Sequence, residues 1–168
     1  SRSHGAVQLA RQAGARVIAT CRSEKQRDII QRAGAHEVVL VNESLVERLK
    51  QLAPRGIDHI VEVAFDANIQ TDLEVLAQGG SIATYASHAF TPEIPFWQLV
   101  FGNARLFFIG SDDVPVEAKV EATHAIDQLV AAGGLTLHVA EIVSLDEIAQ
   151  AHEMVESPKQ PWRVIVTL

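Results

Sequence analysis

The sequence alternates between short apolar runs and amphipathic stretches, and this alternation limits the possible folds more than any other feature. The apolar runs predict strands, and the stretches between them repeat their apolar residues at helical spacing. The expected strands cover residues 16–20, 37–41, 57–63, 81–85 and 105–109, and the expected helices cover residues 5–13, 23–33, 44–53 and 67–77. Strands that alternate with helices form a parallel sheet that is covered on both faces. We therefore expect an α/β fold with a doubly wound, Rossmann-type parallel sheet.

Local end signals support several of these boundaries. Ser23 with Gln26 three residues later matches a capping box, and Gly34 suits the end of the same helix. The stretch "TPEIPFWQLVFGN", residues 91–103, holds two prolines and a short apolar helix, and residues 116–132 are expected to form a long helix that ends at a glycine pair. These signals extend the α/β pattern to about residue 136.

The last part of the chain repeats the pattern once more. Residues 137–143 and 164–168 are expected strands, and the helix 145–156 between them begins with a capping box of Ser144 and Glu147. These strands are too apolar to stand alone in water, so they pair with each other, pack on a neighbouring chain or stay partly disordered. We expect this tail, from about residue 137, to be the most mobile or the most rearranged part of the chain.

The chain opens on a helix, whereas a doubly wound domain opens on a strand and a glycine-rich turn. The expected order of elements is otherwise complete. We therefore expect a doubly wound sheet that lacks its first strand.

Charge and composition exclude several classes of function. The chain has 168 residues, a net charge of −7 and a pI near 5.4, which disfavours nonspecific binding to nucleic acid or to an anionic membrane. Cys21 is the only cysteine, the histidines lack the spacing of metal ligands, and no apolar run is long enough to span a membrane. We expect a cytoplasmic protein with no metal site and no nucleic-acid or membrane partner.

The strongest site signal lies at the carboxyl end of the strand 16–20. In a dinucleotide-binding sheet this tip usually carries an acid that binds the free ribose hydroxyls. Here it carries Arg22 and Ser23, followed by Lys25. An arginine, a serine hydroxyl and a helix N-terminus suit the extra phosphate of NADP(H). The alternative is that the cations form an ordinary solvated helix surface and Ser23 is only a cap.

The tips of the next two strands supply the other candidates. Ala64 is small enough to let a flat cofactor approach, and Phe65 and Tyr85 offer aromatic rings. Ser87 and His88 offer hydrogen bonds to ribose or pyrophosphate. The alternative is that the rings belong to the core and that His88 is an ordinary loop residue. Glu62, inside an apolar strand, is expected to make structural hydrogen bonds rather than to act as a general base.

Five segments together resemble one family. "AVQLARQAGARVIAT", "RAGAHEVV", "GIDHIVEVA", "LAQGGSIATYAS" and "SLDEIAQAHEMVES" follow the order and spacing of the medium-chain dehydrogenases/reductases, and most resemble zinc-independent quinone oxidoreductases of the zeta-crystallin type. This resemblance implies an NADPH-dependent reductase with an N-terminal GroES-like catalytic domain, which this chain lacks. It also implies a cofactor domain over residues 1–136 and a tail over residues 137–168 that returns to the catalytic domain.

The resemblance further implies particular roles. Ser3 stands where relatives carry a glycine of the cofactor turn, and Phe108 and Gly110 lie where relatives approach the nicotinamide. The strand from Arg105 to Ile109 corresponds to an edge strand that pairs across a homodimer axis. The complete enzyme would pass a hydride from NADPH to a quinone or enone, whereas this part alone would bind cofactor at most and carries no catalytic residue.

Two other functions remain open from the sequence. The same scaffold serves as the enoyl-reductase domain of fatty-acid and polyketide synthases. The serines in place of turn glycines would also suit a degenerate, non-catalytic cofactor-binding or structural module.

Overall fold

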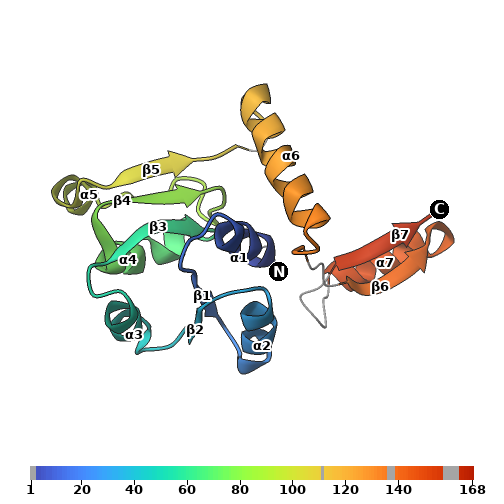
Figure 1. Ribbon diagram of the computed structural model, residues 1–168, viewed down its shortest axis with the longest axis horizontal. Coiled ribbons are helices and arrows are strands. Elements are labelled where there is room, and N and C mark those ends of the chain that lie inside the picture. Colours follow the sequence, from blue (N-terminus) through green and yellow to red (C-terminus); the bar gives the residue numbers. More distant parts are fainter. Residues whose placement is uncertain (1–2, 111, 136–138, 157–162) are drawn as a thin grey trace.

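The computed structural model describes residues 3–110, 112–135, 139–156 and 163–168, and its elements follow the predicted order (Figure 1). All strand pairs in the described residues are parallel, as the alternation predicts. The elements are α1 (Ser3–Gln12), β1 (Ile18–Cys21), α2 (Glu24–Arg32), β2 (Glu37–Leu40), α3 (Leu45–Leu52), β3 (Ile57–Glu62), α4 (Phe65–Val75), β4 (Leu76–Thr84), α5 (Phe96–Gly102), β5 (Arg105–Phe108), α6 (Val116–Ala131), β6 (Val139–Ser144), the 3₁₀ turn η1 (Leu145–Glu147), α7 (Ile148–Glu156) and β7 (Arg163–Thr167).

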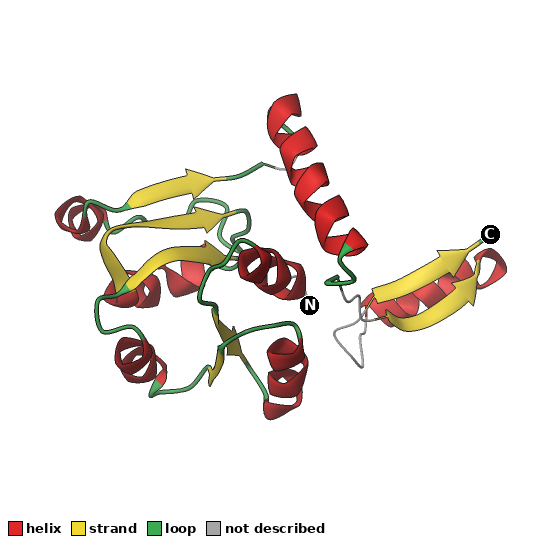
Figure 2. Cartoon of the chain, viewed as in Figure 1, coloured by secondary structure: helices red, strands yellow, loops and turns green. Residues whose placement is uncertain are grey.

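Helices cover both faces of the β1–β2 pair (Figure 2). On β2, Val38 belongs to a core cluster that α1 and α2 line, and its neighbour Val39 belongs to a second cluster that α3 and α4 line. Successive side chains of a strand point to opposite faces, so the two clusters lie on opposite sides of the sheet. This arrangement is the doubly wound fold that the sequence predicts.

The strands form three separate sheets rather than one continuous sheet. Their orders are β1–β2, β3–β4–β5 and β6–β7. The doubly wound order 3-2-1-4-5-6 places the first strand at the centre, beside strands two and four. The chain opens on α1, so β1 and β3 take the places of those two strands. The break between β1 and β3 therefore falls where the missing first strand belongs.

The boundary between α4 and β4 differs from the prediction. The sequence predicts a helix to residue 77 and a strand from residue 81, but α4 ends at Val75 and β4 begins at once. Leu76 pairs with Ile57, and the register then shifts before Ser81 pairs with His59. Gly56 permits this because its φ is +85° and a Cβ there would lie 2.5 Å from the backbone of Ala77. The early start of β4 therefore depends on a contact with a distant turn.

One predicted capping box is confirmed and the other is wrong. The Ser144 side chain and Glu147 form the reciprocal pair at the start of η1. Ser23 makes no side-chain cap bond, because Gln26 instead accepts a hydrogen bond from the Arg22 N–H at 3.1 Å. The hydroxyl of Ser23 is therefore not used to cap α2.

The C-terminal elements form a small βαβ unit. Strands β6 and β7 pair with each other in parallel, and α7 packs against both. Figure 1 shows this unit apart from the larger sheets, beyond the long helix α6. Of the three outcomes expected for these strands, the structure shows pairing with each other.

Within the described residues, no helix is long and apolar enough to cross a membrane.

Candidate functional site: a cofactor cleft at the strand tips

Ligands of doubly wound proteins bind outside the carboxyl ends of the strands. The ends that matter here are those of β1, β3, β4 and β5. Apart from Ser3, the residues that the sequence predicts for the cofactor lie at or next to these four strand ends.

The tip of β1 presents positive charge with few internal partners. Arg22, Ser23 and Lys25 are all exposed, and in the described residues their own side chains take part in no hydrogen bond or ion pair. Arg27 differs, because its Nε lies 2.7 Å from Glu24 Oε2 and its Nη1 donates to the Val38 carbonyl at 3.1 Å. Glu24 also raises the pKa of Arg27, first through this hydrogen bond and then through its charge. Arg22 and Lys25 are thus the tip cations that can meet an external anion.

Glu62, at the end of β3, has a structural role, as the sequence predicts. It is buried, and its Oε1 accepts hydrogen bonds from the Val63 N–H at 2.6 Å, the Ala64 N–H at 2.5 Å and Asn68 Nδ2 at 3.0 Å. These donors lie at the start of α4, so Glu62 ties the strand to the N-terminus of that helix.

Asp72 lies one helical turn beyond Asn68 and is also buried. Burial, and secondly the Glu62 carboxylate, raise the pKa of Asp72 to about 8. Among the described residues, its Oδ2 atom is buried without a hydrogen-bond partner. The sequence analysis missed this group, although an aspartate on the apolar face of a predicted helix signals it.

The aromatic ring of Phe65 lies in the core rather than in the cleft. Phe65 is 1% exposed and packs with Ile69 and Ile82. Its ring meets Phe108 edge to face, with centroids 5.5 Å apart. Phe108 is exposed, so the buried ring of Phe65 packs against the inner side of an exposed ring. Ala64 is buried directly before it.

The loop after β4 carries Tyr85, Ser87 and His88, all of which are exposed. Asp66, in the first turn of α4, accepts hydrogen bonds from the N–H groups of His88 and Ala89 at 2.9 and 3.2 Å. The sequence analysis missed Asp66. The signal that could have found it is an acid immediately after a strand tip.

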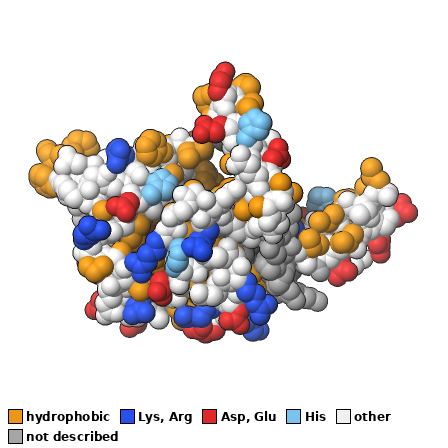
Figure 3. All heavy atoms as spheres, in the orientation of Figure 1, with side chains coloured by type: hydrophobic (Ala, Val, Ile, Leu, Met, Phe, Trp, Pro, Cys, Tyr) orange, Lys and Arg blue, Asp and Glu red, His pale blue; other side chains and the backbone are white. Residues whose placement is uncertain are grey.

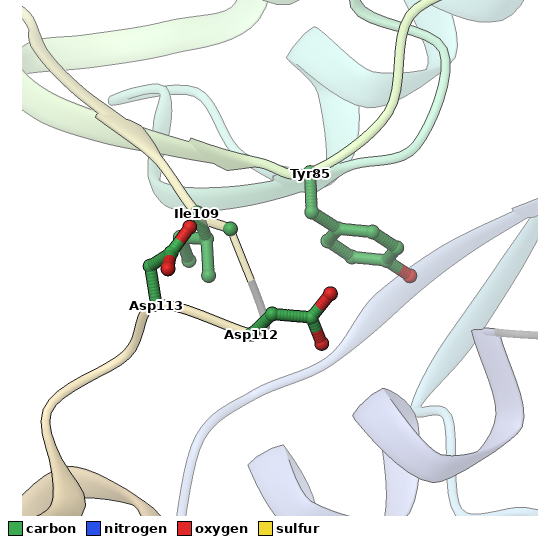
Figure 4. Close-up of a pocket in the computed structure, with 5 residues that line it drawn as sticks. Tyr85, Ile109, Asp112 and Asp113 are labelled. Carbon is green, nitrogen blue, oxygen red and sulfur yellow. The ribbon is translucent and has the colours of Figure 1, made fainter.

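A pocket of about 520 Å³ lies between the ends of β4 and β5 (Figure 4). Its lining includes two predicted residues, Tyr85 and Gly110, and three that the sequence analysis missed: Ile109, Asp112 and Asp113. Figure 4 shows Tyr85 and Asp112 on facing sides, whereas Asp113 lies beside Ile109. Asp112 and Asp113 closely follow the predicted strand 105–109. Polar residues directly after a strand end lie where ligands bind in such a sheet, so their position could have indicated them as site residues.

Two predictions about the site remain, one on Ser3 and one on a metal. Ser3 begins α1, but its side chain lies outside the described part of the structure. Across the described ranges, no group of three or more histidine, cysteine, aspartate or glutamate side chains could hold a metal ion.

The parallel strands, the helices on both faces and the pocket at the strand ends define a Rossmann-type α/β fold. Residues 3–136 match the family described as zinc-binding dehydrogenase, so the chain belongs to that family. Curated relatives are quinone oxidoreductases: 150 residues are 27% identical to the protein of Sus scrofa and 26% identical to that of Homo sapiens. Each match covers 88% of this chain and 45% of the relative, so this chain spans about half of their length.

Solved structures of similar fold include dehydrogenases and a quinone oxidoreductase. An NAD-dependent alcohol dehydrogenase superposes with a TM-score of 0.81 at 23% identity, covering 99% of this chain and 48% of that protein. A Pseudomonas syringae quinone oxidoreductase gives 0.79 at 18% identity, over 98% of this chain and 53% of that one. CurA of Vibrio vulnificus, solved with NADPH, gives 0.78 at 18% identity, over 98% and 52%. The chain is therefore the cofactor-binding portion of a medium-chain dehydrogenase/reductase.

Proposed function

We propose that this chain binds NADPH and forms the cofactor domain of an oxidoreductase that reduces a quinone or enone. The observation that carries the proposal is the tip of β1, where Arg22 and Ser23 replace the usual carboxylate. A carboxylate there would repel the 2′-phosphate, whereas a guanidinium and a hydroxyl can both donate hydrogen bonds to it. The neighbouring relatives include an NAD-dependent and an NADPH-bound protein, so the tip residues decide the cofactor rather than the fold.

The other site residues fit the remaining parts of a dinucleotide. Ser3 begins the first helix, at the end that suits the pyrophosphate. The buried Ala64 leaves room for the cofactor, the His88 ring can hydrogen-bond to its ribose, and the Ser87 hydroxyl oxygen, whose proton is donated to the Ala89 carbonyl, can still accept from a ribose hydroxyl. Tyr85, Phe108 and Gly110 lie at the ends of β4 and β5, which we assign to the nicotinamide. When bound, the dinucleotide supplies the hydride, and the protein orients it and excludes water.

In this proposal, the substrate binds mainly to a catalytic domain that this chain does not include. Residues 1–136 form the cofactor domain, and residues 137–168 form a tail that packs on a catalytic domain. No residue of this chain is assigned as a catalytic acid or base. The identity of the curated relatives as quinone oxidoreductases supports the substrate class.

The proposal predicts that Arg22→Ala weakens NADPH binding by roughly 10- to 150-fold and NADH binding little. A charge-assisted hydrogen bond to phosphate contributes about 1.5–3 kcal/mol, and only NADPH carries that phosphate. Fluorescence titration of both cofactors measures the two dissociation constants, and Arg55→Ala, another exposed arginine, is the control. Equal losses for both cofactors would contradict the clamp, and binding of neither by the unmodified chain would contradict the proposed function.

We also propose that the complete protein is a homodimer through β5. One edge of β5 pairs with β4, and its other edge has no strand partner among the described residues. Phe107 and Phe108 are exposed on it, and hydrophobic side chains gather over α5 and β5 (Figure 3). An apolar edge of this kind invites pairing with another strand.

A further inference from the structure

The loop after β4 is held in place by the first two residues of α4. The Phe65 N–H donates to the Ala86 carbonyl at 3.1 Å. Asp66 Oδ1 accepts from the His88 N–H at 2.9 Å, and its Oδ2 accepts from the Ala89 N–H at 3.2 Å. Three hydrogen bonds from adjacent residues thus connect the tip of β3 to the tip of β4, which are far apart in the sequence.

The charge of Asp66 is well compensated where it lies. Its side chain is only 23% exposed, it sits in the first turn of a helix, and the His88 ring Nδ1 is 3.5 Å from its Oδ1. The hydrogen bond from the His88 N–H is the main cause that lowers the pKa of Asp66. The helix N-terminus also favours an anion at this position. The carboxylate therefore stays ionised and keeps both acceptors at neutral pH.

These bonds determine which groups of the loop remain for a ligand. The N–H groups of His88 and Ala89 and the carbonyl of Ala86 are already paired, and the Ser87 hydroxyl donates to the Ala89 carbonyl at 2.9 Å. The side chains of Tyr85 and His88 remain outward, at 46% and 78% exposed. Tyr85 also lines the pocket at the ends of β4 and β5. The loop thus offers side chains rather than backbone donors.

We infer that Asp66 is a positioning residue for cofactor binding, which holds Tyr85 and His88 in the cleft by fixing the loop between them and α4. This inference rests on the proposed function, because the cofactor is the ligand that the loop would meet. The loop follows β4, whereas the predicted phosphate clamp follows β1. Loss of the Asp66 side chain should therefore raise the dissociation constants of NADPH and NADH by the same factor.

The experiment compares Asp66→Ala, Asp66→Asn and the control Asp58→Ala, which removes an exposed carboxylate from β3. Hydrogen exchange of residues 85–89 reports the loop, and titrations with NADPH and NADH report binding. Asp66→Ala should speed loop exchange and weaken both cofactors by about tenfold, since two charge-assisted hydrogen bonds are lost. Asp66→Asn should recover part of each effect, because its single oxygen can accept one of the two bonds.

A pH profile separates positioning by the carboxylate from general packing. In the unmodified chain, the extra protection of the His88 and Ala89 amides should disappear in acid as Asp66 becomes protonated. Asp66→Asn should lack this dependence. Unchanged loop exchange in Asp66→Ala would overturn the inference, and so would faster exchange with unchanged binding of both cofactors. If the unmodified chain binds neither cofactor, the proposed function fails, and with it the cofactor role of Asp66, while the exchange data still decide whether Asp66 holds the loop.

Discussion

Two aspartates of the helix α4 have pKa values that shift in opposite directions. Asp66, at the start of α4, accepts backbone hydrogen bonds that favour its charged form. Asp72, two turns later, is buried beside Glu62, and burial disfavours its charged form. The same residue type thus stabilises the protein in different pH ranges, according to what surrounds it.

Asp72→Asn should remove a loss of stability at alkaline pH. Because the folded pKa of Asp72 is about 8, above its ordinary value, its contribution is full in acid and declines as pH rises from about 4 to about 8. Asparagine resembles the protonated form and does not titrate. The variant should unfold at similar urea concentrations to the unmodified chain at pH 5, and should be more stable at pH 9 by on the order of 2 kcal/mol.

The control for this measurement is Asp127→Asn, which changes an exposed carboxylate on α6. Its stability should follow that of the unmodified chain at both pH values. Equal stability of Asp72→Asn and the unmodified chain at pH 9 would show that Asp72 is ionised at little cost in the folded protein.

At the scale of elements, the strand edges matter most. The sequence predicts β5 correctly as an apolar strand, and the structure places it at the end of the order β3–β4–β5. The free edges of β1 and β3 lie at the break between the first two sheets, where a doubly wound fold places another strand. Among the described residues, the outer edge of β5 has no strand partner, and we propose that a second copy pairs there.

Phe107→Lys should shift a dimer toward monomer. Phe107 is 49% exposed on β5, and two copies that pair there would bring the new lysines close to the dimer axis. Sedimentation at micromolar concentration measures the change. Phe90→Lys, which alters a fully exposed phenylalanine away from the strand, should leave the assembly unaltered. A dimer that persists in Phe107→Lys would place the contact on another surface.

At the scale of the whole molecule, the break between β1 and β3 is the main feature. Ile18 of β1 and Ile60 of β3 pack on the same core cluster, although their strands are not hydrogen bonded to each other. A strand inserted between them would hydrogen bond to the free edges of both strands and join the two sheets into one.

An N-terminal extension should therefore stabilise the molecule. The extension would carry the residues that precede the matching region in the Sus scrofa relative. We expect slower hydrogen exchange in β1 and β3 and a melting temperature higher by several degrees. The control is the same extension with prolines in the added strand, which cannot complete the ladder. Equal melting temperatures for the two extended proteins would show that the added strand does not insert.

The sequence by itself determined the order of elements and the tip of β1. Apolar periodicity and capping signals are local, so they predict the alternation of strands and helices, the long helix α6 and the exposed Arg22 and Ser23. The same signals predict the parallel pairing, because each helix must carry the chain back to the same end of the sheet. The mobility expected of the C-terminal tail stays a prediction.

Only the tertiary structure decided features that depend on contacts between distant residues. Gly56, directly before β3, lies so close to the Ala77 backbone of β4 that a Cβ would not fit, and this close approach permits the early start of β4. Phe65 lies in the core and Asp66 lies against the next loop, although they are neighbours in the sequence. Asp112 joins the pocket because β4 and β5 end together. Strand pairing and burial depend on residues that are distant in the sequence, and local patterns carry no information about them. The positions of the strand tips could therefore be predicted, whereas the contacts made there could not.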